Sequence, residues 1–414
     1  MNDKVYVYAG WMNDTFIGVL HVLHGNGRET VSFDFGEEWL QAHADILLDP
    51  NLAPFAGRQY PPANRAFFGM LSDVCPDRWG RRLIQRREEI SAAREQRPPR
   101  HLYEMDYLTS ITDLVRTGGL RFKFQPDGEF ITASNTFDVP PVTELRELEQ
   151  ASLNYEFSDD PYETKWLAQL LSPGSSLGGA RPKANIMGTN GELWIAKFPS
   201  RNDDIDIGAW EYVTHELAAL CGLNVPEAKL QRFSEYGSTF MVKRFDRKGG
   251  TRIHFASAMT MLDAVDGQSE RYSYLDIAEF LTSYGRNPAK DLEELYRRIA
   301  FSIAVSNHDD HLRNHGVILR EHGWELSPAY DLNPSMDNLQ YLSLNINLES
   351  SRSSFDLLQS TAEFYQLSKQ KGEEIIERVR DVVHENWLRL AHQTSITENQ
   401  IRRMRPCFEI VSES

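Results

Sequence analysis

Apolar and polar residues alternate along the first part of the chain, as they do in strands that bury one face. The stretch Val5–Phe35 alternates in this way around an Asn-Asp turn and a Gly-Asn-Gly turn, and it predicts a small antiparallel sheet. The following stretch, Glu37–Gln96, has the apolar spacing of helices and is expected to be mostly helical. The prolines Pro98 and Pro99 are expected to close this unit.

Short strands are predicted in the middle of the chain. Leu120–Phe124 and Glu129–Ile131 flank a Gln-Pro-Asp-Gly turn, and Gly191–Pro199 has the composition of a buried strand. Two further runs, Glu227–Phe233 and Ser238–Phe245, are separated by Ser-Glu-Tyr-Gly and predict a hairpin.

Helices dominate the rest of the pattern. Ile207–Cys221 has apolar residues at helical spacing, with Asp206 as the expected N-cap and Gly222 as the expected stop. Beyond Ser257 the pattern is nearly all helical and is interrupted by one predicted hairpin, Gly316–Ser327.

Composition narrows the class of protein. The 414 residues are long for one compact core, so two or three structural units are expected. The formal net charge of -16 argues against a protein that coats nucleic acid, because phosphate backbones require clustered lysine and arginine. One local exception is the arginine-rich stretch Arg78–Arg100, which we interpret as a solvated helix face, with a partner-binding face as the alternative.

The sequence also indicates a cellular location. Cys75, Cys221 and Cys407 lie far apart and show no Cys-x-x-Cys spacing, as is typical of reduced thiols in the cytoplasm. The first residues lack the basic and apolar pattern of a signal peptide, and no apolar run is long enough to span a membrane. We therefore expect a cytoplasmic protein without a membrane segment.

A glycine-rich stretch, Ser172–Ala184, is the first candidate for chemistry. Gly174, Gly178 and Gly179 would let backbone N–H groups approach phosphates closely, because glycine has no Cβ. The stretch is not a Walker A loop, since no Gly-Lys-Ser or Gly-Lys-Thr follows at the required spacing. A flexible connection between two elements is the alternative interpretation.

Lys197 is the second candidate, because it lies among the apolar residues Trp194, Ile195, Ala196 and Phe198 of a predicted strand. Kinases use a lysine on such a strand to hold the phosphates of ATP, and a glutamate of the next helix pairs with it. Glu211 on the following predicted helix could supply that carboxylate. The alternative is an edge-strand lysine that extends its ammonium group to water.

The stretch SNHDDHLRNHGVIL, Ser306–Leu319, is the third candidate. Asp309 and Asn314 have the spacing of the catalytic base and the magnesium-binding asparagine of a kinase catalytic loop. A predicted hairpin then leads to Asp331, which could reach the same ion. Hard oxygen ligands of this kind suit Mg²⁺ better than a histidine-binding metal.

Two other kinds of protein remain as alternatives. The histidines His308, His311 and His315 could bind zinc, although the hairpin that follows leaves little room for a helix to carry them. A metal-dependent phosphohydrolase would use His308 and Asp309 together with an upstream histidine, for which His254 is the nearest candidate. A pseudokinase that only binds nucleotide is disfavoured, because the set of polar residues named above for a kinase is intact.

With these motifs in place, the sequence resembles the HipA toxin kinases of bacterial toxin–antitoxin systems. NHDDHLRN matches the family pattern N-x-D-x-H-x-x-N, and AYDLNP matches Y-D-x-x-P. SSLGGARPKA resembles the family's glycine-rich loop, and MVKRFDR resembles its hinge signature E-R-F-D-R. RTGGLRF and PDRWG also have family counterparts. The matching positions are Asn307, Asp309, His311, Asn314, Tyr330, Asp331, Pro334, Ser176, Gly179, Ala180 and Lys183.

The resemblance implies an α+β chain with a two-lobed protein-kinase-like fold, an N-terminal β-rich subdomain and an all-helical C-terminal lobe. The implied domains are residues 1–105, the kinase N-lobe at 106–248 and the kinase C-lobe at 249–414. Asp309 is implied as the catalytic base with His311 beside it, and Asn314 and Asp331 as ligands of Mg²⁺. The residues implied in ATP binding are Lys197, Ser176, Gly178, Gly179, Ala180, Lys183, Glu211, Lys243 and Phe245.

The resemblance further implies a toxin that phosphorylates serine or threonine of a host protein and is neutralised by a HipB-like helix-turn-helix antitoxin. Known substrates in the family include aminoacyl-tRNA synthetases, and DNA is contacted only through the antitoxin. Ser176 is implied as a site of autophosphorylation. The sequence departs from the family pattern at Lys243, where the family has an acidic hinge residue, and at the Gly-Ala-Arg-Pro-Lys end of the glycine-rich loop.

Overall fold

The computed structural model of the chain describes residues 3–25, 27–132, 139–157, 170, 181–337 and 340–409. The chain divides into two compact units. Unit 1 comprises Met1–Ser200 and Lys243–Ala256, and unit 2 comprises Arg201–Val242 and Ser257–Ser414. The three domains expected from the sequence, with limits at residues 105 and 248, are not tested by this division and stay a prediction.

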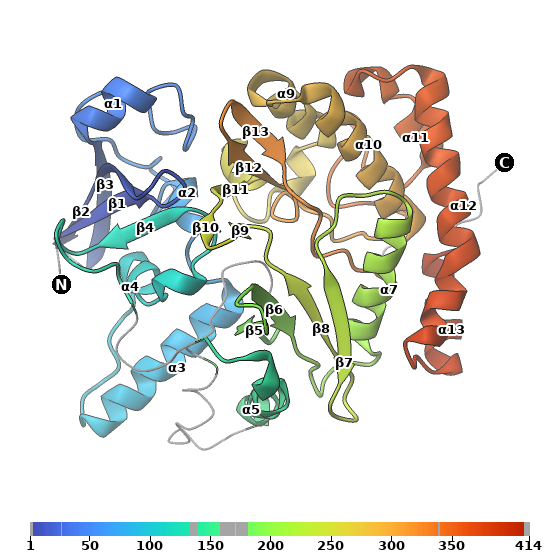
Figure 1. Cartoon of the computed structure of the whole chain (residues 1–414), viewed down its shortest axis with the longest axis horizontal. Coiled ribbons are helices and arrows are strands. Elements are labelled where there is room, and N and C mark those ends of the chain that lie inside the picture. The colour runs from blue at the N-terminus through green and yellow to red at the C-terminus, as the bar shows by residue number, and fades with distance from the viewer. Residues whose placement is uncertain are drawn as a thin grey trace. The chain divides into compact units, whose positions relative to one another are not determined.

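Unit 1 begins with a four-stranded antiparallel sheet in the order β3-β2-β1-β4 (Figure 1). The predicted sheet is therefore confirmed, and a strand from much later in the chain completes it. Asn13 and Asp14 both have a left-handed backbone, with φ of 51° and 58°, and they turn the first strand into the second. The strands are β1 (Lys4–Ala9), β2 (Thr15–Gly25), β3 (Arg28–Phe35) and β4 (Leu120–Lys123).

The helices of unit 1 are fewer than the pattern predicted. Residues 44–68 contain no helix, so the expectation of a mostly helical Glu37–Gln96 is wrong for that part. The reason is that this segment contains four prolines, and that buried Asp49 accepts hydrogen bonds from the backbone of Asn51 and Met70. The described helices of unit 1 are α1 (Glu37–His43), α2 (Gly69–Ser72), α3 (Arg78–Arg94), α4 (Glu104–Thr109) and α5 (Leu145–Phe157).

The remaining strands of unit 1 lie later in the chain. β5 (Lys183–Met187) and β6 (Leu193–Lys197) form an antiparallel pair, so the predicted strand at Gly191–Pro199 is confirmed. The predicted strand at Glu129–Ile131 is wrong, because only Phe130 makes a bridge, to Lys123. The two-residue strands β9 (Arg247–Lys248) and β10 (Thr251–Arg252) also pair.

Unit 2 begins with the predicted helix, α7 (Ile207–Leu220). The Asp206 carboxylate accepts a hydrogen bond from the Ala209 backbone at 3.1 Å, which confirms the predicted N-cap. It also accepts hydrogen bonds from the backbone and hydroxyl of Ser238, at 2.8 and 2.7 Å. Asp206 therefore connects the helix to the predicted hairpin, which is formed by β7 (Ala228–Arg232) and β8 (Ser238–Lys243).

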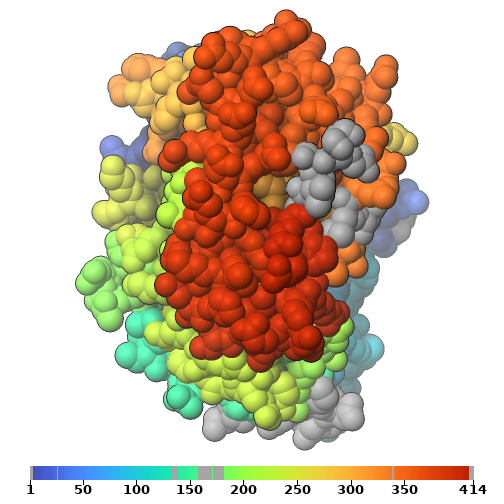
Figure 2. Space-filling view, turned by 90° about the vertical axis from the view of Figure 1, so that its right-hand side faces the viewer, coloured from blue at the N-terminus to red at the C-terminus, as the bar shows by residue number. Residues whose placement is uncertain are grey.

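The helices α7, α10 and α12 lie side by side in unit 2 (Figure 1). α12 and α13 cover much of the face of unit 2 that Figure 2 shows in red. Residues 327–354 contain no helix among those described, so this part of the expected helical region is wrong, whereas the predicted hairpin β12–β13 is confirmed. The elements are β11 (Phe255–Ser257), α8 (Ala258–Met261), α9 (Tyr274–Tyr284), α10 (Pro288–Ala304), β12 (Gly316–Arg320), β13 (Gly323–Leu326), α11 (Phe355–Gln359), α12 (Lys369–Gln393) and α13 (Glu398–Met404).

The longest described helix, α12, carries charged residues throughout its length. None of the helices in the described part of the chain has both the length and the apolar character that a membrane span requires.

Candidate active site

The loop that follows α10 carries the predicted catalytic residues. The chain leaves the helix at Ser306, whose φ of 53° is left-handed. The Ser306 hydroxyl donates to the Cys407 carbonyl at 3.0 Å, and the backbone N–H of Asn307 donates to the Ser302 carbonyl at 2.8 Å. The start of the loop is therefore fixed to the helix before it and to the C-terminal part of unit 2.

Asp309 and Asp310 are adjacent in the chain but have opposite environments. Asp310 is buried, and its carboxylate contacts the His315 ring at 2.9 Å and accepts hydrogen bonds from the hydroxyls of Tyr274 and Ser302, at 2.7 and 3.1 Å. Burial raises the pKa of Asp310, but His315 and these two hydroxyls outweigh it and lower the pKa below its ordinary value. Asp310 therefore acts as a structural anion.

The side chain of Asp309, in contrast, lies at the surface of the loop. Partial desolvation raises its pKa, His311 counteracts this shift, and the negative charges of Asp331 and Asp310 add to it. A carboxylate with a raised pKa and access to solvent is suited to accept a proton. Of the two neighbouring aspartates, Asp309 has the environment of a general base.

Asn314 is oriented by Asp309. Its side-chain amide donates to the Asp309 carbonyl oxygen at 2.8 Å, so its Oδ1 atom is directed away from that contact. Asn314 Oδ1 is buried and accepts no hydrogen bond from the described residues. A buried oxygen atom that accepts no hydrogen bond lowers the stability of the fold, and such an oxygen is suited to bind a cation.

Asp331 completes the polar group in unit 2. Its φ of 58° is left-handed, a conformation that costs energy for a residue other than glycine. Neighbouring contacts fix this turn: the Tyr330 hydroxyl donates to the Arg313 carbonyl at 2.7 Å, and the Asn333 amide donates to Asp331 Oδ1 at 3.3 Å. The negative charge of Asp331 raises the pKa of Asp309. The contact of Tyr330 with Arg313 ties the segment that carries Asp331 to the loop that carries Asp309 and Asn314.

The residues present fit a magnesium ion. Asp331 and Asn314 offer hard oxygen atoms, which Mg²⁺ prefers, and magnesium in kinases takes its remaining ligands from phosphates and water. When bound, Mg²⁺ would neutralise phosphate charge. Among the described residues, no group of three or more histidine, cysteine, aspartate or glutamate side chains is placed to hold a metal ion.

The three histidines of the loop point to separate partners. His308 Nδ1 lies 2.7 Å from the Tyr341 carbonyl oxygen, and His315 contacts Asp310. His311 acts on the nearby Asp309 carboxylate through its charge. These separate partners give the zinc interpretation no support.

The phosphohydrolase alternative is not supported either. His254 belongs to unit 1, where its ring stacks on Trp11 with ring centroids 4.3 Å apart and an interplanar angle of 10°. Burial lowers the pKa of His254 to about 3, so the ring is neutral over the physiological range. His254 is therefore a packed core residue in unit 1.

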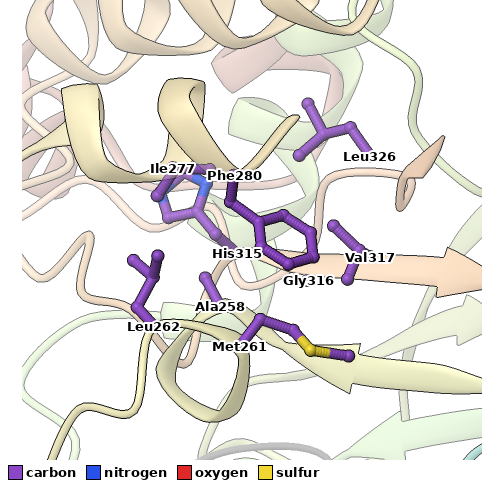
Figure 3. A pocket seen from close by; sticks show the side chains of 9 residues that line it. All are labelled: Ala258, Met261, Leu262, Ile277, Phe280, His315, Gly316, Val317 and Leu326. Atoms are coloured by element: carbon purple, nitrogen blue, oxygen red, sulfur yellow. The ribbon is translucent and has the colours of Figure 1, made fainter. Parts of the chain in front are cut away.

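Behind the catalytic loop, His315 faces an apolar pocket (Figure 3). Its walls come from α8, α9 and the hairpin β12–β13, and the space has a volume of about 10 Å³. A space of this size holds one water molecule at most, and apolar walls offer such a water few partners. The apolar wall shields the His315–Asp310 contact from solvent. The lining residues are Ala258, Met261, Leu262, Ile277, Phe280, His315, Gly316, Val317 and Leu326.

The predicted nucleotide-binding residues of unit 1 gather around β5 and β6. Lys197 ends β6 and is partly exposed, and it lies directly opposite Lys183 in the strand pair. Lys183 is 1% exposed, and its ammonium lies 2.9 Å from the Asp77 carboxylate. Lys197 therefore stays a candidate for phosphate binding, whereas Lys183 has a carboxylate partner inside unit 1.

The predicted hinge residues, which lie in unit 1, also have defined contacts. Lys243 forms an ion pair with Glu192. The partly buried ring of Phe245 packs against Phe255, with ring centroids 5.8 Å apart. Glu211 is buried on α7 in unit 2, whereas Lys197 belongs to unit 1, so their pairing stays a prediction. The predicted loop residues Ser176, Gly178, Gly179 and Ala180 lie outside the residues that the structure describes.

The sequence interpretation missed the buried charge network around Asp246. The Asp246 carboxylate contacts Arg244 at 2.6 Å and Arg247 at 2.9 Å, and it accepts a hydrogen bond from the Gly118 backbone at 2.7 Å. Burial opposes ionisation of Asp246, but the two arginines and the Gly118 N–H group hold its pKa well below the ordinary range. Arg244 also donates to Asn185 of β5 at 2.8 Å. The signal for this network was present in the motifs RTGGLRF and KRFDR.

Comparisons with known proteins identify the family of the chain. The family model described as "HipA-like C-terminal domain" matches residues 175–387, more than half of the chain. A Sinorhizobium fredii protein named as a candidate kinase, Y4dM, is 30% identical over 158 residues, which cover 35% of this chain and 38% of that protein. A Haemophilus influenzae protein, also named as a candidate kinase, is 28% identical over 179 residues, covering 38% of this chain and 52% of that protein. The chain thus matches about half or less of the length of these relatives.

A solved structure matches the whole fold. It is the HipA protein of Shewanella oneidensis in complex with HipB and operator DNA, and it is 16% identical in sequence with a TM-score of 0.69. The match covers 98% of this chain and 95% of that protein, so the two chains share a fold.

Proposed function

The chain belongs to the family with a HipA-like C-terminal domain and has a kinase-like fold, and from this premise we propose that it is an ATP- and Mg²⁺-dependent kinase of protein serine or threonine. The observation that carries this proposal is the arrangement of Asp309, Asn314 and Asp331 in unit 2. Asp309 has a solvent-accessible carboxylate, Asn314 has a buried oxygen without a donor among the described residues, and Asp331 supplies a second carboxylate that raises the pKa of Asp309. Phosphoryl transfer needs these parts.

Each residue has a distinct role in the proposed reaction. Asp309 accepts the proton of the substrate hydroxyl as that oxygen bonds to the terminal phosphorus of ATP, while the bond from this phosphorus to the bridging oxygen breaks and ADP leaves. Asn314 and Asp331 would hold Mg²⁺, which when bound would neutralise charge on the phosphates. Lys197 binds the phosphates from β6, and Glu211 pairs with it. His311 lies beside the base and limits the rise in the pKa of Asp309.

The adenine is proposed to lie near the hinge residues Lys243 and Phe245. Since Lys243 already pairs with Glu192, adenine contacts at this position come from backbone atoms. The glycine-rich loop, with Ser176, Gly178, Gly179 and Ala180, is proposed to cover the phosphates. Ser176 is proposed to be phosphorylated by the protein itself.

The cellular role is proposed by analogy with the family. The solved HipA protein is bound to HipB and operator DNA, and we propose that this chain is a toxin with a HipB-like helix-turn-helix antitoxin. DNA would be reached through the antitoxin. The proposed effect is growth arrest through phosphorylation of a cytoplasmic host protein, with an aminoacyl-tRNA synthetase as the first candidate substrate.

The test is a phosphotransfer assay with γ-labelled ATP. The wild-type protein should transfer label to itself or to a protein of a cell lysate when Mg²⁺ is present and should lose this activity when the ion is chelated. Asp331→Asn, a change of nearly equal size, should abolish transfer while the circular dichroism spectrum stays unchanged. Full transfer by this folded variant would show that the assignment of the site is wrong.

A further inference from the structure

The first turn of α3 holds the end of the strand that carries Lys183. The Trp79 indole N–H donates to the Lys183 carbonyl oxygen at 3.0 Å. The Asp77 carboxylate lies 2.9 Å from the Lys183 ammonium, and their side chains are only 5% and 2% exposed. The same carboxylate caps the helix by accepting a hydrogen bond from the Gly80 backbone at 2.8 Å. One turn of helix therefore contacts both the backbone and the side chain of Lys183.

The strand pairing makes this contact relevant to phosphate binding. Lys183 and Lys197 are direct partners across the antiparallel pair β5–β6. Side chains of direct partners lie on the same face of a sheet with their Cβ atoms about 4.5–5.5 Å apart. Two like charges in that position destabilise a sheet unless one of them is neutralised. Asp77 supplies the neutralising charge.

The energetics of burial explain why Lys183 stays with Asp77. A lysine ammonium that leaves water has a large desolvation penalty, and a buried carboxylate that loses its partner has a similar one. Burial raises the pKa of Asp77, and the Lys183 charge and the backbone N–H groups of α3 act in the opposite direction. Transfer of Lys183 to a phosphate would leave Asp77 buried without its cation, so the exchange is unfavourable.

We propose that Asp77 is a positioning residue of the nucleotide site: it retains the Lys183 ammonium and leaves Lys197 as the lysine of this strand pair that meets the phosphates. This inference rests on the proposed function. It differs from the role in ATP binding that the family resemblance implied for Lys183. Through Asp77, the PDRWG segment would thus determine how many lysine side chains of this strand pair are available to bind the triphosphate.

The test compares binding of ATP with Mg²⁺ by four variants. Lys183→Met should keep the affinity of wild type within about threefold, and Lys197→Met should weaken it by about tenfold or more, because only the latter removes a phosphate ligand. Asp77→Asn should release Lys183 as a second cation and tighten ATP binding by several-fold, on the order of the effect of one added partly screened charge. Asp77→Asn/Lys183→Met should lack this gain.

Adenosine is the control ligand, since it carries no phosphate. A general change in structure would alter the affinities for adenosine and ATP alike, whereas the proposed effect of Asp77→Asn applies to ATP alone. If a single variant unfolds, Asp77→Leu/Lys183→Met removes both buried charges together and should still bind ATP like wild type. Equal loss of ATP affinity in the folded Lys183 and Lys197 variants would overturn the proposal.

Failure of the proposed function gives a different result. A wild-type protein that binds no ATP would contradict the kinase assignment. The Asp77–Lys183 contact would then be measured by thermal unfolding without nucleotide. Each single replacement should lower the melting temperature more than the double replacement does, because each single change leaves one buried charge without its partner. If the decrease in melting temperature of the double variant equalled the sum of the two single decreases, the proposal that Asp77 retains Lys183 would be overturned.

Discussion

The Asn314 side-chain amide donates a hydrogen bond to the Asp309 carbonyl oxygen at 2.8 Å. This contact fixes which end of the amide is available, because the nitrogen is occupied and Oδ1 has no hydrogen-bond partner among the described residues. The proposed base and the proposed metal ligand are thereby held in one loop. A change at Asn314 should therefore affect the metal before it affects the nucleotide itself.

Asn314→Ala should raise the Mg²⁺ concentration needed for half-maximal phosphotransfer by about tenfold or more, because one oxygen ligand is lost. The assay is a magnesium titration at a fixed, saturating ATP concentration. Asn314→Asp keeps an oxygen atom at this position, so it should raise the required Mg²⁺ concentration less than Asn314→Ala does. If both variants follow the wild-type titration curve, Asn314 is not a magnesium ligand.

Replacement of Asp309 and Asp310 should have opposite consequences. Asp309→Asn should reduce phosphotransfer by about 10²-fold or more and leave ATP affinity and the melting temperature close to wild type, because it removes the general base from an exposed position. Asp310→Asn should lower the free energy of unfolding by about 3 kcal/mol, because the buried His315 contact loses its anion. Calorimetry and single-turnover kinetics on both variants check this. If Asp310→Asn lost phosphotransfer and Asp309→Asn lost stability, Asp310 would be the general base.

Asp246→Asn should destabilise unit 1 by about 3–5 kcal/mol, because it leaves the buried Arg244 and the partly buried Arg247 without their shared carboxylate. Urea unfolding followed by circular dichroism measures this loss. Asp127→Asn, at an exposed aspartate of the same unit, is the matched control and should be neutral. A neutral result for Asp246→Asn would mean that the charge network contributes no net stability.

Glu29→Gln should raise stability above neutral pH. Burial raises the pKa of Glu29 from 4.5 to about 7. The hydrogen bond from the Met105 N–H group lowers this pKa, and repulsion from Asp106 and Glu104 raises it further. The unfolded chain releases this proton at lower pH than the folded protein, so stability falls as the pH rises from about 4.5 to about 7.

The measurement is thermal unfolding of the Glu29→Gln variant and the wild-type protein between pH 4 and pH 8, a range of about four pH units. The melting temperatures of variant and wild type should converge at the acid end and diverge above neutral pH. Glu37→Gln, at an exposed glutamate near the same sheet, should show no such divergence. A constant difference across the range would point to packing and not to titration.

Ser176→Ala should prevent the gain of one phosphate that we expect of the wild-type protein after incubation with ATP and Mg²⁺. A phosphate at this position adds about -1.5 to -2 charges beside the anionic triphosphate, so the modified protein should bind ATP poorly. Intact-mass spectrometry reads out the modification, with Asp309→Asn as the inactive control. A phosphate retained in the alanine variant would direct attention to Ser175.

Local signals predicted the elements that have local causes. Asp206 caps α7 as its position before the apolar run indicated, and the turn at Asn13 and Asp14 has the left-handed backbone that these residue types tolerate. The spacing of Asp309 and Asn314 indicated one loop, and the structure joins them through the Asn314 amide and the Asp309 carbonyl oxygen, whereas their role as one site with Asp331 stays a prediction. Such features depend on a few neighbouring residues.

The features that the sequence could not reveal depend on distant partners. Nothing in the alternation of β5 shows that Lys183 meets Asp77, which lies 106 residues earlier in the chain. The same holds for Tyr274, whose hydroxyl donates to Asp310. Residues 44–68 were misread as helical because apolar spacing was given more weight than the prolines and the side-chain bonds of Asp49.

The route of the chain through the two units has a consequence for synthesis on the ribosome. Unit 1 is interrupted after Ser200 and is completed only by Lys243–Ala256, which contains Asp246. At about 5–20 residues per second, roughly 3–10 s pass between the emergence of the first part of unit 1 and that of its closing segment. Until then the Gly118 N–H group lacks the carboxylate that it binds in the finished protein. The nascent chain therefore cannot complete unit 1 until Lys243–Ala256 has been synthesised, although Ser200 was added long before.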